Sequence, residues 1–231
     1  MITSNNNAKV KQVVQWQTKA KERRKDHVFL AEGIRMCEEA PVKNVREVYL
    51  TEELEQKIRQ NDQNGDTAFW DKLQQTGYET VSTEVFAKMA DTQTPQGILT
   101  VLEQPVYDLT QLLEQPDPLF LMLENLQDPG NLGTMIRTGE GAGITGVIMN
   151  NQTVDIFNPK TIRATMGSIF RVPFVYVPDL APVLEQMHAK GIHTYAAHLK
   201  GQEYYDSFSF REPTAFLIGN EGNGLSKEIS D

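Results

Sequence analysis

Short hydrophobic runs alternate with amphipathic segments along the second half of the chain. Five apolar runs predict strands, at residues 119–123, 146–149, 174–177, 192–197 and 214–219. Three segments between them have apolar side chains at helical spacing, at residues 131–142, 158–170 and 180–189. Apolar strands that alternate with helices predict an α/β fold, with a mostly parallel sheet and helices on both faces. Ligands of such sheets bind beyond the carboxyl ends of the strands, here the loops after Leu123, Ala197 and Gly219.

The first half of the chain has the pattern of a second, smaller α/β unit. Val10, Val13 and Val14 predict an amphipathic helix, and Asn64-Gly65 predicts a turn. Four apolar runs predict strands, at residues 28–31, 45–50, 78–81 and 98–102. Pro116 and Pro118 interrupt a polar stretch where the pattern changes. We therefore predict an N-terminal domain over 1–107, a linker over 108–118 and a second domain over 119–231.

The charge of the chain is unevenly distributed. The whole sequence carries 22 basic and 31 acidic residues, a net charge of -9, which argues against a nucleic-acid partner. The first 25 residues, however, hold seven bases and one acid, a charge of +6 that leaves -15 for the rest. The average therefore conceals a basic arm on an acidic body, and a basic arm suits a nucleic-acid backbone.

Composition excludes several classes of protein. The longest strongly apolar run has five residues, whereas a membrane-spanning helix needs about 20. The N-terminus is polar and has no hydrophobic stretch of a secretory signal. The single cysteine, Cys37, excludes an internal disulfide, and the four histidines lack the spacing of metal ligands. We expect a cytoplasmic protein with neither a membrane segment nor a bound metal.

The segment from Gly141 to Gly146 matches the dinucleotide fingerprint G-x-G-x-x-G. That fingerprint requires glycines that follow a strand and open a helix, so that amides at the helix N-terminus meet pyrophosphate. These glycines instead follow a predicted helix and precede a strand, which is typical of a helix stop and a tight turn. A nucleotide-binding oxidoreductase is therefore the weakest of the functional hypotheses.

Residues 124–138 form a polar loop that runs from a strand into a helix. The simplest interpretation is an ordinary connection in which Asn131 caps the helix. That interpretation leaves Arg137 unexplained, because its neighbours on the helix are small or apolar. An arginine in this position can face a groove where a phosphate or a ribose hydroxyl arrives.

Residues 216–226 run from an apolar strand into a loop with three glycines and the carboxylate of Glu221. The loop is either a simple turn or a site where backbone amides approach an adenosine-type ligand closely. In the segment 160–168, Lys160 and Arg163 flank one helical face, which by default is a solvated basic face.

Two motifs in this order resemble the SpoU/TrmH family of S-adenosylmethionine-dependent RNA 2′-O-ribose methyltransferases. They are N-x-x-D-P-G-N-L-G-x-x-x-R-T, which begins at Asn125, and G-N-E-G-x-G-L-S, which begins at Gly219. Residues 160–170 are similar to the middle segment of the family. Residues 29–33 are similar to the ribosomal-protein-like RNA-binding domain that many members carry. The resemblance covers most of the chain.

The resemblance implies a catalytic domain with a trefoil knot, S-adenosylmethionine as cofactor and a homodimer formed through the catalytic domain. It also implies structured ribosomal RNA as the substrate. Carried over by position, the catalytic candidates are Asn131, Arg137 and Glu221. The cofactor-binding candidates are Leu199, Gly219, Asn220 and Gly222. The candidate RNA-binding cations are Lys19, Lys21, Arg23, Arg24, Lys25, Lys160 and Arg163.

The sequence departs from the family pattern after Leu225, where a third motif with a Ser-x-Asn signature is expected. The sequence ends at Asp231, so the resemblance predicts a catalytic domain that lacks this motif. Two alternatives stay open on these grounds, a non-catalytic RNA-binding module and a transfer-RNA ribose methyltransferase.

The role of Arg137 has two alternatives. Family accounts make the equivalent arginine the base that takes the proton of the ribose hydroxyl. Arginine in water stays protonated, with a pKa above about 12, so the residue would instead stabilise the developing alkoxide as a cation.

Overall fold

The computed structural model describes residues 1–63 and 67–230, so the predicted turn at Asn64-Gly65 lies outside the described residues. The chain forms two compact units. The first comprises Met1–Pro105 together with Phe157–Phe170, and the second comprises Val106–Ile156 together with Arg171–Asp231. Residues 157–170 therefore pack with the first unit, although the sequence pattern placed them beyond the linker.

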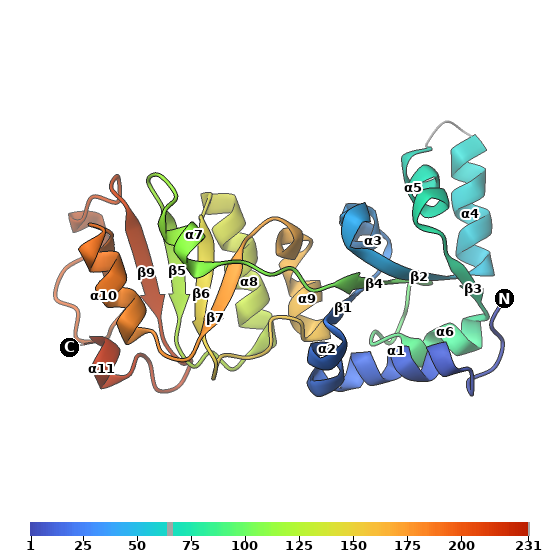
Figure 1. Cartoon of the computed structure of the whole chain (residues 1–231), viewed down its shortest axis with the longest axis horizontal. Helices are drawn as coiled ribbons and strands as arrows, with labels where there is room; N and C mark the ends of the chain where they lie inside the picture. Colours follow the sequence, from blue (N-terminus) through green and yellow to red (C-terminus); the bar gives the residue numbers. More distant parts are fainter. Residues whose placement is uncertain (64–66, 231) are drawn as a thin grey trace. The chain divides into compact units, whose positions relative to one another are not determined.

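The second unit is built on a parallel sheet, as predicted (Figure 1). Its strands are β5 (Leu119–Leu123), β6 (Gly146–Asn150), β7 (Phe174–Val177), β8 (His193–Ala196) and β9 (Thr214–Ile218). Their order is β7-β6-β5-β9-β8, and every pair is parallel. The strands β5 and β9 are neighbours in the sheet, although they are far apart in the sequence. Their carboxyl ends, and the loops that leave them, therefore meet at one edge of the sheet.

Helices cover both faces of this sheet. Helices α7 (Leu109–Leu113) and α10 (Ala181–Ala189) pack on one face, over the buried side chains of Phe120, Met122 and Leu217. Helix α8 (Pro129–Ala142) lies on the opposite face, where it borders Leu121 and Phe216. This division follows from the alternation of side chains along β5 and β9. A last short helix, α11, spans Lys227–Ser230.

The first unit contains a mixed sheet. Its strands are β1 (Val28–Glu32), β2 (Val45–Thr51), β3 (Glu79–Val81) and β4 (Ile98–Glu103), in the order β1-β4-β2-β3. Strand β4 pairs antiparallel with β1 and β2, and β2 pairs parallel with β3. The four predicted strands are present, and the bounds of each differ from the predicted ones by one residue.

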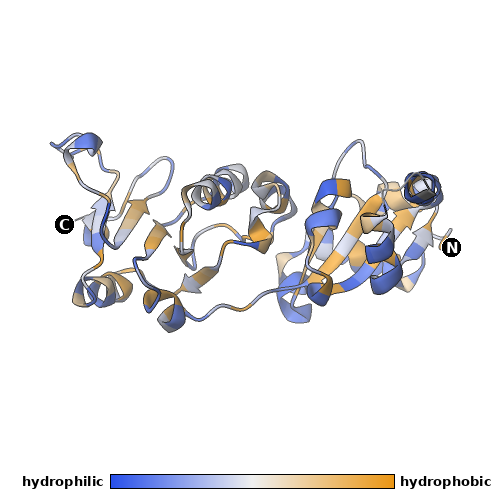
Figure 2. Ribbon diagram, turned by 90° about the horizontal axis from the view of Figure 1, so that it is seen from above, coloured by the Kyte–Doolittle hydropathy of each residue, from blue (hydrophilic) through white to orange (hydrophobic). Residues whose placement is uncertain are grey.

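Two layers of helices enclose this sheet. One layer contains α1 (Ala8–Thr18) and α6 (Thr83–Met89), which bury Val10, Val13 and Phe86 against the strands. The other contains α3 (Ile34–Glu39), α4 (Glu52–Gln63) and α5 (Ala68–Thr76). Helices α2 (Ala20–Asp26) and α9 (Pro159–Thr165) complete the unit, with short 3-10 turns at Val42–Asn44 and Ser168–Phe170. Figure 2 shows hydrophobic strands inside and hydrophilic helical faces outside.

The predicted helix over 158–170 is wrong beyond Thr165. Its start is confirmed, because the side chain of Asn158 accepts a hydrogen bond from the Lys160 amide at 2.9 Å. Met166 then adopts a left-handed conformation with a φ of 51°, and Gly167 follows with a φ of 96°. These angles end the α-helix, and the apolar spacing continues through a 3-10 turn.

The glycines that match the dinucleotide fingerprint serve the turn between α8 and β6. Gly143 ends α8 with a φ of 74°, and Gly146 begins β6. A helix precedes these glycines, so their amides do not form the phosphate site of the fingerprint. The helix-stop interpretation is confirmed.

Within the described ranges 1–63 and 67–230, no helix has the length and apolar character that crossing a membrane requires.

Candidate active site

The loop that follows β5 is tied to the loop that follows β6 by two asparagines. The backbone N–H of Asn125 donates to Oδ1 of Asn150 at 2.9 Å, and Nδ2 of Asn150 donates back to Oδ1 of Asn125 at 2.9 Å. Thr153 adds a third bond, because its hydroxyl donates to Oδ1 of Asn150 at 2.9 Å. Asn125 has a φ of 56°, a left-handed conformation that asparagine tolerates better than most residues. The loop is therefore fixed in one conformation.

The loop that follows β9 is closed by Asn220. Its backbone exchanges two hydrogen bonds with Gly224, of 3.0 and 2.8 Å. Its Oδ1 accepts from the amides of Gly222 and Asn223, at 3.0 and 2.9 Å. Its Nδ2 donates to the carbonyl of Asn125 at 2.9 Å, which joins this loop to the one after β5. Asn220 thus holds two loops that are 95 residues apart in sequence.

Gly219 allows the two ends of the β9 loop to approach each other. A Cβ atom at this position would lie 2.1 Å from the carbonyl carbon of Gly224 and 2.2 Å from the amide nitrogen of Leu225. Both are backbone atoms that cannot move aside as a flexible side chain can. Gly219 is therefore required for the closure of the loop, and it shapes any site that the loop forms.

Glu124 anchors the far end of the same loop. It follows β5 directly and is only 7% exposed. Its Oε2 accepts a hydrogen bond from the Ser226 amide at 2.7 Å. The carboxyl ends of β5 and β9 are therefore linked by a buried carboxylate as well as by Asn220.

Glu221 links the β9 loop to the start of α8. Its carboxylate accepts from the amides of Asp128 at 2.8 Å and Gln127 at 3.0 Å, and from Nδ2 of Asn131 at 3.2 Å. Burial by itself raises the pKa of Glu221, but these hydrogen bonds outweigh it and hold the pKa below its ordinary value. Glu221 is therefore ionised at neutral pH, and it fixes Asn131 beside the loop.

The cap of α8 is Asp128 rather than Asn131. Oδ1 of Asp128 accepts from the Asn131 amide at 2.8 Å, and Pro129 occupies the first helical position. The prediction that Asn131 caps the helix is wrong, because the helix begins two residues earlier. As a result the Asn131 side chain is free of capping and can point to Glu221.

Arg137 lies further along α8. It is exposed, and it has no hydrogen-bond or ion-pair partner among the residues that the structure describes. Six helical positions separate it from Asn131, which corresponds to about 9 Å along the axis and roughly 120° around it. The structure thus brings Asn131 and Glu221 into contact, and it does not bring Arg137 into contact with either of them.

A cavity of about 330 Å³ opens beside these loops. Its lining consists of Asn125, Asn220, Asn223, Gly224, Leu225 and Ser226. Amide groups and a hydroxyl supply hydrogen bonds there, and Leu225 supplies an apolar wall, a donor set that suits an adenosine-type ligand. Asn220 lines this cavity, while Gly219 and Gly222 belong to the loop that forms it.

Leu199 does not lie with the other cofactor candidates. Its side chain is fully exposed in the loop after β8, and it does not line the cavity beside the β9 loop. Among the described residues, no cluster of three His, Cys, Asp or Glu side chains could hold a metal ion.

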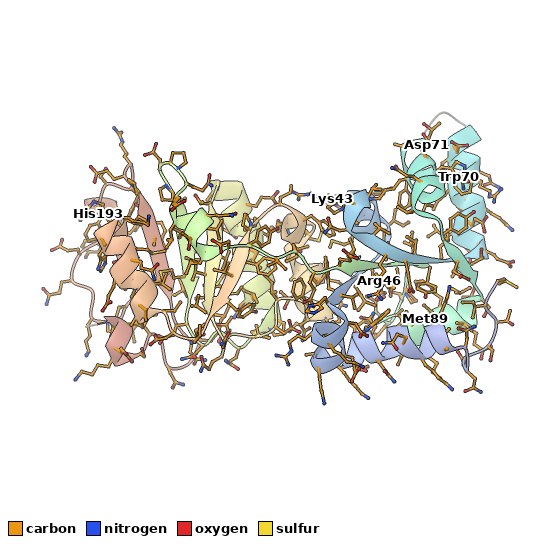
Figure 3. The ribbon with its side chains drawn as sticks, viewed as in Figure 1. Lys43, Arg46, Trp70, Asp71, Met89 and His193 are labelled. Carbon is orange, nitrogen blue, oxygen red and sulfur yellow. The ribbon has the colours of Figure 1, made fainter. Side chains whose placement is uncertain are left out.

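Four of the candidate RNA-binding cations, Lys19, Lys21, Arg24 and Lys25, are exposed at the junction of α1 and α2. Arg46 lies near these helices (Figure 3). Its guanidinium is 6.0 Å from the ring centroid of Trp16, within cation–π range. This part of the first unit therefore presents a basic surface.

Arg23 differs from its neighbours. Its side chain is only 3% exposed, and its Nη1 donates to the carbonyls of Trp16 at 2.7 Å and Gln17 at 3.3 Å. The guanidinium satisfies carbonyls at the end of α1, so it serves the fold and we remove Arg23 from the candidate RNA-binding residues. Its position on the buried face of α2 explains why charge alone misplaced it.

The two candidate cations on α9 differ as well. Lys160 is exposed. Arg163 is half-buried, and its Nη1 forms an ion pair with Oδ2 of Asp91 at 2.5 Å. Asp91 belongs to the loop before β4, so Arg163 joins α9 to that loop within the first unit.

Several residues of this site were not predicted from the sequence. The loops are organised by Glu124, Asn125, Asn150 and Thr153. The sequence marks these residues as functional only through their position. Each directly follows a buried parallel strand or lies within three residues of its end. Asp128 had a clearer signal, because Asp followed by Pro is a typical helix start.

Comparison with known proteins agrees with this geometry. Residues 118–231 match the model of the SpoU rRNA Methylase family, and residues 7–100 match that of the MRM3-like substrate binding domain. The 23S rRNA (guanosine(2553)-2′-O)-methyltransferase RlmP of Bacillus subtilis (strain 168) is 34% identical over 231 residues, 99% of this chain and 85% of that protein. The chain belongs to the SpoU rRNA methylase family. The family predicted from the two motifs is therefore confirmed.

Solved structures of methyltransferases extend the likeness to the fold and the cofactor. An AdoMet-bound rRNA methyltransferase from Sinorhizobium meliloti has a TM-score of 0.83 and 28% identity, over 99% of this chain and 84% of that one. The SpoU methyltransferase AviRb from Streptomyces viridochromogenes, in complex with AdoMet, has a TM-score of 0.78 and 26% identity, over 96% of this chain and 84% of that one. The predicted α/β fold and S-adenosylmethionine as the family's cofactor are confirmed.

Proposed function

We propose that the protein transfers a methyl group from S-adenosylmethionine to a ribose 2′-hydroxyl of ribosomal RNA. The observation that carries the proposal is the position of Glu221. It joins the β9 loop, which borders a cavity suited to an adenosine-type ligand, to Asn131 on the family's first motif. Membership of the SpoU rRNA methylase family supports the same activity and the same substrate.

The proposed cofactor site is the cavity beside the β9 loop. Asn223, Gly224 and Leu225 would hold the adenosyl part, and Gly219 and Asn220 would keep the loop closed around it. S-adenosylmethionine supplies a methyl group on a sulfonium, which an oxygen nucleophile attacks in line. The rigid loop conformation is the contribution of the protein, because it fixes the position of the acceptor relative to this group.

Asn131 is the residue that we assign to the ribose hydroxyl. Its Nδ2 donates to Glu221, and its Oδ1 accepts no hydrogen bond within the described part of the chain. The amide oxygen is therefore available to accept a hydrogen bond from the ribose 2′-hydroxyl and so to orient the hydroxyl oxygen for attack. Glu221 acts on the reaction through Asn131, as a positioning residue.

We assign Arg137 a charged role. The residue is exposed and no described group pairs with it, so its five N–H donors are accessible to the substrate. A charged arginine stabilises the negative charge that develops on the ribose oxygen as this oxygen takes the methyl group from the sulfonium and its proton passes to water, and it can hold a neighbouring phosphate of the RNA. Proton removal by a neutral arginine is the alternative mechanism.

RNA recognition is assigned to the first unit. Residues 7–100 match a substrate binding domain, and the α1–α2 junction presents Lys19, Lys21, Arg24 and Lys25 to solvent. These cations are suited to a phosphate backbone, and Lys160 on α9 adds a further exposed charge of the same sign.

We further propose that the protein acts as a cytoplasmic homodimer whose catalytic domain is knotted. The family resemblance supports both the dimer and the knot, and ribosomal RNA as substrate supports the compartment. Light scattering tests the dimer, with twice the 26.1 kDa mass of the chain as the expected result.

The activity is tested by incubating the protein with tritiated S-adenosylmethionine and unmodified 23S rRNA, 16S rRNA or transfer RNA made by transcription. We expect label in ribosomal RNA only. Label in transfer RNA alone would establish the transfer-RNA alternative. RNA binding without calorimetric binding of S-adenosylmethionine, by this chain and equally by one extended with the third motif, would establish the non-catalytic module.

A further inference from the structure

The first unit contains a cavity of about 320 Å³ that the catalytic mechanism does not use. Its walls come from the end of β1, the start of α3, the loop before β4 and the end of α9, all within the first unit. The volume is at the lower end of the range for small-molecule sites and suits a single nucleotide.

The loop before β4 is held in place by the buried end of β1. Glu32 is 8% exposed, and its carboxylate accepts from the Asp91 amide at 2.8 Å and from the Thr92 hydroxyl. On the other side of the loop, Oε1 of Gln96 accepts from the Ile34 amide at 2.8 Å. The loop is anchored at both ends, and the wall that it forms is preorganised.

Two residues that line this wall, Thr94 and Gln96, have polar groups that the protein leaves without a partner in the described ranges. Nε2 of Gln96 donates to no group in the described ranges, and the same holds for the hydroxyl of Thr94. Both side chains are exposed. An amide and a hydroxyl can together donate to and accept from the edge of a nucleobase.

Apolar and cationic groups complete the cavity. Met36 and Met166 supply thioether side chains, and sulfur packs favourably against an aromatic ring. Met166, which has a left-handed backbone, is 38% exposed. Arg35 is exposed and paired with Glu39 at 3.0 Å, Arg163 is paired with Asp91, and both arginines line the cavity. The site thus offers polarizable walls, unused polar groups and two guanidinium groups whose carboxylate partners a phosphate would replace or join.

We propose that this cavity receives one unpaired nucleotide of the RNA substrate, with the base between the methionines and the phosphate beside Arg35. The proposal rests on the proposed function, since it assumes that the substrate is RNA. An unpaired base can leave its helix, stack on a flat or polarizable side chain and present its edge to hydrogen-bonding groups. This site would recognise a particular base, whereas the cations at the α1–α2 junction recognise only the backbone.

Two variants of the full chain test the site by filter binding to radiolabelled 23S rRNA transcript. Thr94→Trp fills the cavity from an exposed position, and Arg35→Ala removes its charge. Gln60→Trp is the matched control for the first, since Gln60 is exposed on α4. Lys57→Ala is the control for the second. Lys57, like Arg35, is an exposed cation on a helix and forms an ion pair with a glutamate four positions away, Glu53 for Lys57 and Glu39 for Arg35.

We expect both site variants to raise Kd about tenfold, Thr94→Trp because one base can no longer stack and Arg35→Ala because one charged contact to a phosphate is lost, and both controls to stay within about twofold. In methyl transfer, the site variants should raise KM for RNA and leave kcat unchanged. Binding of all four variants within twofold of the wild type would overturn the proposal. If circular dichroism shows that Thr94→Trp is unfolded, the binding of Arg35→Ala alone tests the proposal.

The same preparations separate this proposal from the proposed function. Methyl transfer by the wild type together with unaffected binding by the site variants would overturn the cavity alone. Weakened binding by the site variants without any methyl transfer by the wild type would overturn the activity and leave the cavity supported. A wild type that binds no RNA would overturn both.

Discussion

The carboxyl edge of the parallel sheet and the α1–α2 junction use polar side chains in opposite ways. At the sheet edge, the side chains of Asn150, Asn220 and Glu221 form hydrogen bonds with neighbouring loops. At the junction, Lys21 and Lys25 are exposed and have no ion-pair partner among the described residues. A reaction that depends on in-line attack needs fixed positions, whereas attraction to a phosphate backbone needs only accessible charge. The two regions are therefore expected to respond differently to mutation.

The largest effect is expected at Arg137, which lies near the rigid region and yet has an unpaired side chain. Arg137→Ala should lower kcat for methyl transfer by about 100-fold or more, because a charged donor to a developing anion is lost. Stability should stay within about 0.5 kcal/mol, since the residue is exposed. The measurements are single-turnover transfer and urea unfolding.

Arg137→Lys is the matched variant. It retains the charge, so partial recovery of activity would support electrostatic stabilisation by Arg137. A lysine variant whose rate rises strongly with pH would instead favour proton removal by the side chain at this position.

Gly219→Ala should cause the largest loss of stability, about 3 kcal/mol, because the new Cβ would lie 2.1 Å from the backbone of Gly224. Gly222→Ala in the same loop is the control, since its Cβ would make an ordinary contact at 3.6 Å. Urea unfolding measures both. Equal stability of the two variants would show that the β9 loop is not rigid.

Arg23→Ala and Arg24→Ala compare neighbouring arginines with opposite roles. Loss of Arg23 should cost about 2 kcal/mol, because the carbonyls of Trp16 and Gln17 lose a buried charged donor. Loss of Arg24 should change stability by less than about 0.5 kcal/mol, because the residue is exposed. RNA affinity should fall for Arg24→Ala. Thermal unfolding and filter binding check the pair.

The triple variant Lys21→Ala, Arg24→Ala, Lys25→Ala should weaken RNA binding mainly by changing its salt dependence. The slope of log K against log salt is negative, and each lost phosphate contact reduces its magnitude by roughly 0.7 to 0.9. The magnitude should therefore fall by about 2 to 3 in total. Titrations from low to moderate salt measure the slope. An unchanged slope would remove the α1–α2 junction from the RNA interface.

The smallest effect concerns the pH dependence of stability at Glu221. Its pKa is lowered in the folded state, so its contribution is fully present above the ordinary value of 4.5 and is lost as pH falls below it. We expect about 1 kcal/mol, at the low end for bonds to a charged group because Glu221 is exposed. Glu221→Gln should lose less stability than the wild type between pH 5 and pH 3, as measured by urea unfolding.

The architecture around the site was largely predictable, and the contacts within it were not. Apolar runs such as 119–123 and 214–219 predicted buried parallel strands and the edge where their loops meet. The partners of Asn125 lie 25 and 95 residues away, and no local pattern identifies such pairs. Charge predicted a basic arm, but only packing distinguishes the buried Arg23 from the exposed Arg24.

The most direct test of the central claim is the chemical position of the transferred methyl group. Unmodified 23S rRNA is labelled by the protein with tritiated S-adenosylmethionine and then hydrolysed in alkali, which requires a free 2′-hydroxyl at each cleaved bond. We predict label in alkali-resistant dinucleotides, and its loss with Arg137→Ala. Label in mononucleotides would contradict the assignment of ribose 2′-O-methylation.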